Sequence, residues 1–231
     1  MHIPDGYLSP STCATLGIVM LPVWYHASNK LKKTLYVSRI PLLAMGAVFS
    51  FLIMMFNVPI PDGTTAHAIG ATLIAIILGP WSAVITMSVA LVIQAIVFGD
   101  GGILAIGANT FNMAFVAPFV GYYVYRFISK NALPGSKRQI MAGAVAAYIA
   151  INIAALAASI EFGIQPLLFT EPDGTPLYCP YGLSVAVPAM LLAHLTVAGF
   201  VEGIVTAAAL KFIAIQSLDA MISQPKIGKE A

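Results

Sequence analysis

The residues best suited to chemistry stand at the start of the chain, in Met1-His-Ile-Pro-Asp-Gly6. A histidine in second position puts three nitrogens on one short path: the Met1 α-amine, the His2 backbone amide and the His2 imidazole. Around a metal ion, the amine and amide close a five-membered ring, and the amide and Nδ1 close a six-membered ring. Because the amide must lose its proton, this pattern favours strongly square-planar ions, Ni²⁺ and Cu²⁺, over Zn²⁺.

The chelate needs a free α-amine on Met1. The first residues lack the basic region and the small-residue cleavage site of a secretory signal, so we expect no signal processing. A bulky second residue also protects the initiating methionine from trimming. We therefore expect Met1 to be retained.

A square plane requires a fourth donor, for which His67 is the natural candidate. We expect it near the start of a short helix, on the same face as the N-terminus, with Gly63-Thr-Thr65 as helix caps. The positive end of a helix disfavours a charged imidazolium and keeps the ring available as a ligand. The simpler alternative is a disordered His2 and an interfacial His67 bonded to a loop carbonyl, but the two histidines together favour a metal site.

Other polar residues interrupt apolar stretches or lie beside them. Asp5, Gln94, Asp100, Asn109 and Asn112 are candidates for holding the N-terminal segment or orienting His67, and ordinary hydrogen bonding between helices is the alternative for the amides. His194 and Glu202 lie eight residues apart in one apolar stretch. We expect these two to form a structural pair or to contact a partner, rather than to bind metal.

The composition determines which elements must position these residues. Of 231 residues, 59% are apolar and 9% are charged, so lipid must be the main solvent. Continuous apolar runs without a period of two indicate helices rather than a barrel. We predict an all-α integral membrane protein: a bundle of seven transmembrane helices in a single domain, 1–231, with its metal-binding segment at 1–10. The predicted spans are roughly 11–28, 40–56, 66–79, 81–98, 106–127, 138–160 and 183–212.

The third predicted span is short, about 21 Å by the helical rise, and the Gly79-Pro80 turn fixes one end of it. The loop before it, Asn57–Thr65, should therefore dip into the membrane. Irregular backbone at that depth must be packed by protein or line a cavity, so we predict that Val58–Gly63 forms a cavity wall. The loops at 99–102 and 161–182 should roof the same pocket.

The predicted spans place basic and acidic residues on opposite sides of the membrane. The basic residues all fall after the first span, between the fifth and sixth, or after the seventh: Lys30, Lys32, Lys33, Arg39, Arg126, Lys130, Lys137, Arg138, Lys211, Lys226 and Lys229. Because basic loops stay cytoplasmic, the N-terminus should be outside and the C-terminus inside. The charged residues predicted on the other side are all acidic: Asp5, Asp62, Asp100, Glu161, Glu171 and Asp173. Their field would attract cations, but the alternative is that they are simply the charged residues left when the basic residues are kept inside.

Several motifs resemble the CbiM/NikM family, the substrate-binding membrane components of cobalt and nickel energy-coupling factor transporters. They are Met1-His-Ile-Pro-Asp-Gly-Tyr-Leu8, Asn57-Val-Pro-Ile-Pro-Asp-Gly-Thr-Thr-Ala-His67, Phe98-Gly-Asp-Gly-Gly-Ile103, Gly107-Ala-Asn109 and Phe111-Asn-Met-Ala114. The resemblance covers essentially the whole chain. It implies capture of Ni²⁺ or Co²⁺ outside a prokaryotic cytoplasmic membrane, with Met1, His2 and His67 as ligands.

The resemblance also implies partners: a transmembrane coupling component, two ATP-binding-cassette ATPases and, in some members, a small further membrane component, separate or fused. No nucleic acid is expected, and Cu²⁺ binding is expected only in vitro. The chain lacks a Gly-x-x-x-x-Gly-Lys-Ser/Thr loop, so it cannot hydrolyse ATP itself. Small residues between 142 and 158 could face the coupling partner or pack inside the bundle.

Two other functions are weaker interpretations of the same residues. An intramembrane metalloenzyme needs an open metal position and a general base, and a square filled by four nitrogens leaves no activated water. A self-sufficient metal permease needs polar residues through the bundle, and the second and third spans have almost none. We therefore predict a transport component that is not an enzyme.

The charge pattern yields a test of orientation. With Cys13 and Cys179 replaced by alanine, a cysteine introduced at Lys32 should escape an impermeant thiol reagent in whole cells, and one at Asp173 should react, because basic loops stay inside. Labelling at Lys32 in intact cells would overturn the predicted topology.

Overall fold

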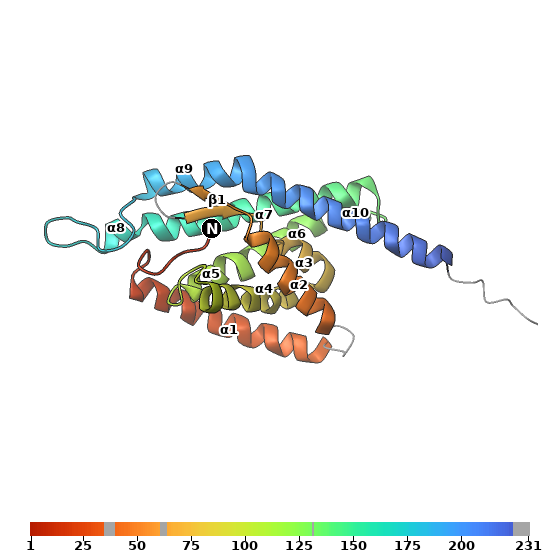
Figure 1. The fold of residues 1–231 in the computed structure, drawn as a ribbon, viewed down its shortest axis with the longest axis horizontal. Helices are drawn as coiled ribbons and strands as arrows, with labels where there is room; N and C mark the ends of the chain where they lie inside the picture. Colours follow the sequence, from red (N-terminus) through yellow and green to blue (C-terminus); the bar gives the residue numbers. More distant parts are fainter. Residues whose placement is uncertain (35–39, 61–63, 131, 224–231) are drawn as a thin grey trace, which may run out of the picture.

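The computed structural model describes residues 1–34, 40–60, 64–130 and 132–223, and within them it forms a bundle of helical rods, as predicted (Figure 1). Seven rods make up this described part: α1 (Pro10–Thr34); α2 (Ile40–Met54); α3 (Ala71–Leu78); α4 (Pro80–Ile93) with η2 (Gln94–Phe98); α5 (Ile106–Thr110) with η3 (Phe111–Val116) and α6 (Ala117–Ser129); α7 (Lys137–Gly163), followed by α8 (Gln165–Leu168); and α9 (Leu183–Ala193) with η4 (His194–Ala198) and α10 (Gly199–Ser223).

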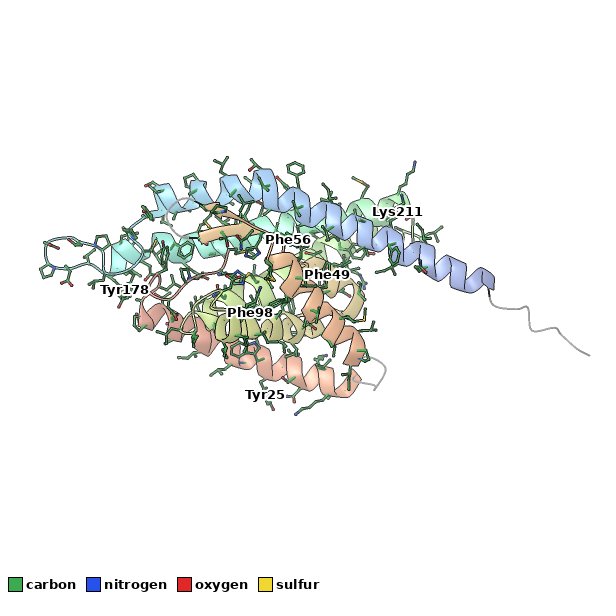
Figure 2. All side chains as sticks on the ribbon, in the orientation of Figure 1. Tyr25, Phe49, Phe56, Phe98, Tyr178 and Lys211 are labelled. Atoms are coloured by element: carbon green, nitrogen blue, oxygen red, sulfur yellow. The ribbon has the colours of Figure 1, made fainter. Side chains whose placement is uncertain are left out.

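The rods present apolar side chains outward as well as inward (Figure 2). Among the described residues, three stretches are long and apolar enough to cross a membrane, 80–98, 137–168 and 183–216, and α2 is a shorter apolar helix. Phe127 is 72% exposed and Leu192 is 66% exposed. Such side chains are costly in water, so hydrocarbon is the natural surroundings of the bundle.

Helix α7 runs through the bundle and packs against α6, α9 and α10. Its small residues face inward: Ala142, Gly143, Ala146, Ala147, Ala154 and Ala158 are buried. A Cβ atom on Gly143 would lie 2.3 Å from Leu210 Cδ1, which shows how closely α10 approaches. These small residues therefore pack inside the bundle, rather than forming an exposed surface for a coupling partner.

A two-stranded hairpin precedes α3, an element that the sequence analysis did not predict. Strand β1 (Asn57–Ile60) pairs antiparallel with β2 (Thr64–His67), so that Asn57 lies opposite His67. Residues 61–63, which include Asp62 and Gly63 of the predicted cavity wall, lie outside the described residues. The hairpin lies against the interior of the bundle, with β1 above the chain's N-terminus in Figure 1.

The predicted start of the third span is therefore wrong. His67 ends a strand rather than beginning a helix, and α3 starts at Ala71. The residue before α3 is Gly70 with φ 71°, a left-handed conformation that glycine adopts readily, so the threonines are not helix caps. The other end is as predicted, because α3 ends at Leu78 and Pro80 opens α4.

Three rods change from α to π geometry, at η2, η3 and η4. Each π turn contains a polar residue that stands out in the apolar sequence: Gln94, Asn112 and His194, all buried. A π turn is rare and is frequently found at functional sites. The three polar side chains thus lie where the helices are locally irregular.

The described basic residues gather toward one end of the bundle. The C-terminal end of α1, the α6–α7 connection and the C-terminal half of α10 lie at that end, and α8 lies at the opposite one (Figure 1). Arg39, Lys226 and Lys229 are outside the described residues. This separation agrees with the charge pattern, and the orientation in a membrane remains a prediction.

The contact between α1 and α5 yields a stability test with a built-in control. A Cβ atom on Gly107 would lie 2.5 Å from the backbone nitrogen of Gly17, whereas one on Gly17 would meet nothing within 4 Å. We expect Gly107→Ala to destabilise the fold by roughly 1–3 kcal/mol, as overpacking does. Thermal unfolding in detergent should show a lower midpoint temperature for Gly107→Ala than for the wild type. The midpoint temperature of Gly17→Ala should not be lowered. Equal midpoints would contradict the close approach of the two backbones.

Candidate metal centre

The first nine residues, here called the N-terminal segment, thread into the bundle beside the hairpin. Met1 and Ile3 are completely buried, and His2 is nearly so. The α-amine donates a hydrogen bond to the carbonyl oxygen of Thr65, and Thr64 Oγ1 donates to the His2 carbonyl oxygen at 3.1 Å. Strand β2 therefore lines one side of the N-terminal segment.

The opposite side is formed by α5 and the loop before it. Asn109 Oδ1 accepts from the Ile3 amide at 2.8 Å, and Asn109 Nδ2 donates to the Ile3 carbonyl at 3.1 Å. The Asp5 carboxylate accepts from the Ile103 and Leu104 amides, each at 3.0 Å. Asn109 and Asp5, both singled out in the sequence, thus hold the N-terminal segment in place.

The far end of the segment is attached to α8 and to the loop before α9. The Ser9 amide donates to Gln165 Oε1 at 3.0 Å, and the Cys179 amide donates to the Tyr7 carbonyl at 3.1 Å. Together with the contacts above, these bonds leave the N-terminal segment little freedom to move as a tail. A disordered terminus, the alternative considered for His2, does not describe this fold.

The two predicted ligand histidines lie against each other. The rings of His2 and His67 are stacked, with centroids 4.7 Å apart and an interplanar angle of 28°. His2 Nε2 donates to Gln94 Oε1 at 3.2 Å, and His67 Nδ1 donates to the Ala68 carbonyl at 3.1 Å. These bonds fix one tautomer of each ring, because the donor nitrogen carries the proton.

The other nitrogen of each ring is therefore a free lone pair. Within the described chain, neither His2 Nδ1 nor His67 Nε2 has a hydrogen-bond partner, although both are buried. A buried polar atom without a partner is costly and calls for an explanation. Here both unpaired atoms are strong metal ligands beside a primary amine.

Burial keeps all three groups uncharged. Burial lowers the pKa of the Met1 amine to about 4, although the nearby Asp100 carboxylate opposes this shift. Burial also lowers the pKa of the His2 imidazole to about 3, and the nearby amine lowers it further. Burial likewise holds the pKa of His67 well below its usual value. Near neutral pH the amine and both rings thus have lone pairs to donate, which is the state that a metal requires.

Side chains alone do not make a metal site here. In the part of the chain that the structure describes, no three His, Cys, Asp or Glu side chains converge as a metal-holding group. Any ion bound between His2 and His67 must take its remaining ligands from elsewhere. The Met1 amine and the His2 amide are the nitrogens at hand, and no hydrogen bond among the described residues occupies that amide N–H.

Asp100 and Asn112, also singled out in the sequence, have different surroundings. Asp100 Oδ1 lies 3.6 Å from His2 Nδ1, at the edge of the site. Asn112 Nδ2 donates instead to Glu161 Oε2 on α7 at 2.9 Å. Asn112 therefore forms a hydrogen bond between helices, which was the alternative interpretation of the buried amides.

The predicted pairing of His194 with Glu202 is wrong. His194 Nδ1 bonds to the Met190 carbonyl at 2.8 Å, within its own helical rod. Glu202 Oε2 accepts from the Ile69 and Gly70 amides at 2.7 and 2.9 Å. The carboxylate of α10 thus holds the turn that directly follows His67, a role that spacing along one helix cannot reveal.

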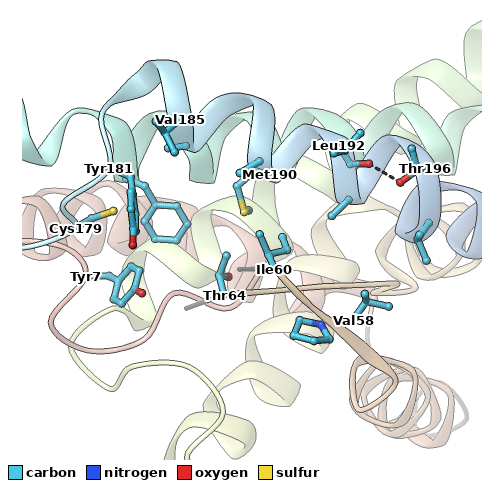
Figure 3. A pocket seen from close by; sticks show the side chains of 16 residues that line it. Tyr7, Val58, Ile60, Thr64, Cys179, Tyr181, Val185, Met190, Leu192 and Thr196 are labelled. Atoms are coloured by element: carbon cyan, nitrogen blue, oxygen red, sulfur yellow. Dashed lines mark hydrogen bonds between the residues drawn. The ribbon is translucent and has the colours of Figure 1, made fainter. Parts of the chain in front are cut away.

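A cavity of about 500 Å³ lies on the other side of the hairpin, between β1 and α9 (Figure 3). Its lining is mostly apolar, with Ile60, Val185 and Met190 pointing into it and Tyr7 and Tyr181 at one end. None of the three predicted ligand residues lines it. This cavity is suited to apolar groups rather than to an ion. Residues of β1 and of the predicted 161–182 roof line it, but β1 is a strand rather than an irregular loop, and no residue of the 99–102 loop lines the cavity.

Sequence reasoning missed the contribution of Thr64 and Thr65. Both residues contact the N-terminal segment through β2, but they were interpreted as helix caps. Two adjacent β-branched residues that follow a Pro-Asp-Gly sequence are typical of a strand, and that signal was present.

Comparison with known proteins gives consistent relatives. A family model described as a cobalt uptake substrate-specific transmembrane region matches residues 2–219. The fused nickel transport protein NikMN of Rhodobacter capsulatus is 56% identical over 207 residues, which are 90% of this chain and 60% of that protein. A putative metal transport protein of Methanocaldococcus jannaschii is 53% identical over 208 residues, 90% of this chain and 88% of that protein.

The fold is shared with solved structures. The crystal structure of a truncated transition metal transporter superposes with a TM-score of 0.90 at 56% identity, covering 94% of this chain and 99% of that one. A second transition metal transporter structure gives a TM-score of 0.89. The chain therefore spans nearly all of these transporters, but only about 60% of the fused protein. With its sequence matched almost throughout and its fold shared with these transporters, this chain belongs to the CbiM family.

Proposed function

We propose that this chain captures a divalent transition metal, Ni²⁺ or Co²⁺, in a square of four nitrogens for ATP-driven uptake. The four donors are the Met1 amine, the His2 amide, His2 Nδ1 and His67 Nε2. The cargo enters from the extracytoplasmic side. A transmembrane coupling component, two ATP-binding-cassette ATPases and, in some systems, a further small membrane component complete the transporter.

The observation that carries this proposal is the pair of buried, unpaired imidazole nitrogens beside a buried amine. Each ring is fixed in the tautomer that leaves its inward nitrogen as a lone pair. Outer hydrogen bonds of this kind orient ligand rings at known metal sites. Without a cation, two such nitrogens have no energetic reason to stay buried and unpaired.

The ligand set supports Ni²⁺ over Co²⁺. An ionised amide in a square plane suits an ion with a strong preference for that geometry, and Cu²⁺ is expected to bind in vitro for the same reason. Two fused nickel transport proteins, NikMN of Rhodobacter capsulatus and a probable LarMN of Lactiplantibacillus plantarum, are 56% and 52% identical to this chain. The cobalt transport protein CbiM of Lachnoclostridium phytofermentans is 37% identical over a shorter region.

Other residues serve the site without binding the metal. Gln94 orients the His2 ring, Asn109 and Asp5 hold the N-terminal segment, and Glu202 holds the turn after His67. Belonging to a transport family agrees with the prediction that the chain is not an enzyme.

Removal of either ligand ring tests the site directly. We expect His2→Ala and His67→Ala each to weaken Ni²⁺ binding by more than roughly 100-fold, the upper range for losing an outer-shell partner, because each removes a ligand itself. Calorimetric titration of purified protein in detergent measures the affinity. The matched control is His26→Ala, because the His26 ring packs against Trp81 at a tilt, with ring centroids 4.4 Å apart, away from the N-terminal segment. This variant should bind Ni²⁺ like the wild type. Affinity at the wild-type level in either ligand variant would refute the four-nitrogen site.

The spacing between the amine and the first histidine gives an independent test. Inserting one alanine after Met1 creates a terminus whose amine, two amides and imidazole fill a square without His67. Such a variant should still bind Ni²⁺, should be unaffected by adding His67→Ala, and should fail to transport, because the metal no longer joins the terminus to the bundle.

An N-terminal tag should act differently, since it converts the amine into a peptide nitrogen. We expect the tagged protein to lose binding, and removal of the tag by a protease that leaves Met1 first should restore it. Normal binding and transport by the tagged protein would show that the terminal amine is not a ligand.

A further inference from the structure

At the edge of the four-nitrogen site, two electron-rich atoms face each other without a proton between them. His2 Nδ1 is a lone pair, because the ring proton is on Nε2, and Asp100 Oδ1 lies 3.6 Å from it. Neither atom can donate to the other when the ring is neutral and the carboxylate ionised. Two acceptor atoms at this separation can both bind one cation placed between them.

The two residues differ in their access to solvent. The Asp100 side chain is 37% exposed, whereas that of His2 is 4% exposed. Asp100 therefore reaches from the surface to the first buried ligand. The loop is also packed against the ring: a Cβ atom on Gly101, which has φ 90°, would lie 3.3 Å from His2 Cδ2.

One residue holds both sides of this contact. The Gln94 side chain accepts from His2 Nε2, and its backbone carbonyl accepts from the Asp100 amide at 3.0 Å. The separation of carboxylate and imidazole is thus set by the π turn η2, rather than by a free loop. A divalent cation lies about 2.0–2.2 Å from each of its ligand atoms. Two such ligand atoms are therefore about 2.9 Å apart when they meet the ion at a right angle and about 4 Å apart when they lie on opposite sides of it. The observed separation of 3.6 Å lies within this range, so a divalent cation fits between the two atoms.

We propose that Asp100 Oδ1 and His2 Nδ1 form an outer cation position, which an incoming divalent metal occupies before it moves into the four-nitrogen square. This inference rests on the proposed function of Met1, His2 and His67. A hydrated ion exchanges water for the carboxylate oxygen and the imidazole nitrogen first. The amine and His67 Nε2 then bind, and the His2 amide releases its proton to water as its nitrogen binds the metal and completes the square. The carboxylate leaves the metal, its charge still beside the site.

The outer position therefore governs how fast the metal arrives. A carboxylate at a cleft mouth raises the local cation concentration and the association rate, and a ligand contact adds to this effect. The final complex contains four nitrogens with or without Asp100. Removing the carboxylate should slow binding and leave the spectrum of the bound metal unchanged.

Stopped-flow mixing of full-length protein with Ni²⁺, followed through the absorption band of the square-planar complex, tests this order of events. Asp100→Asn should lower the association rate constant roughly tenfold or more, the scale of electrostatic effects on association. Asp100→Glu, which keeps a carboxylate, should recover most of that rate. Asp173→Asn is the matched control, because Asp173 is an exposed carboxylate in the loop after α8. This variant should bind Ni²⁺ at the wild-type rate.

The end point of each trace separates the possible outcomes. Equal final amplitude and band position in Asp100→Asn and wild type, with slower association, support the outer position and show that the variant is folded. An association rate equal to that of the wild type, an equal slowing in Asp173→Asn, or a shifted final band would overturn it. Absence of a square-planar band in the wild type would instead refute the four-nitrogen site itself.

Discussion

Burial of the chain's own amino group is the constraint on which this half of the bundle depends. A charged ammonium taken out of water costs several kcal/mol even after relaxation, unless it is paired. Burial instead lowers the pKa of the amine, which favours its neutral form. The Thr65 carbonyl oxygen accepts a hydrogen bond from the amine, and Met1 is wholly enclosed. The N-terminus of the chain forms hydrogen bonds with strand β2 on one side and with the loop before α5 and Asn109 of α5 on the other.

Non-helical backbone inside an apolar bundle needs hydrogen-bond partners, since hydrocarbon supplies none. Among the described residues, the His2 amide, a proposed metal ligand, has no such partner. The polar side chains that meet this demand interrupt otherwise apolar rods, and some lie where the helix changes to π geometry. Gln94 opens η2 and bonds to His2, while Asn109 lies in α5, two residues before η3 begins, and bonds to Ile3. Glu202 meets the same need at the turn after His67. Of the polar residues in the three π turns, Gln94 contacts the enclosed, non-helical segment, whereas Asn112 bonds to α7 and His194 bonds within its own rod.

The helices could be predicted from hydropathy because each must be apolar over its whole length, and their number was right, although the third begins at Ala71 rather than at 66. The ligand candidates Met1, His2 and His67 followed from chelate chemistry, which depends on covalent spacing rather than on the fold. The hairpin was missed because its strands are short and its apolar residues few, so tertiary contacts decide its structure. The partner of Glu202 could not be found, since Ile69 and Gly70 contribute only backbone amides, which no side-chain pattern records.

The threading of the N-terminal segment also has a consequence for biosynthesis. Its hydrogen-bond partners lie far along the chain, at Thr65, Asn109, Gln165 and Cys179. Contacts of such long sequence separation form late, because the intervening chain must first be ordered. We therefore expect the N-terminal segment to reach its native position last, after the helices that enclose it have been inserted and packed.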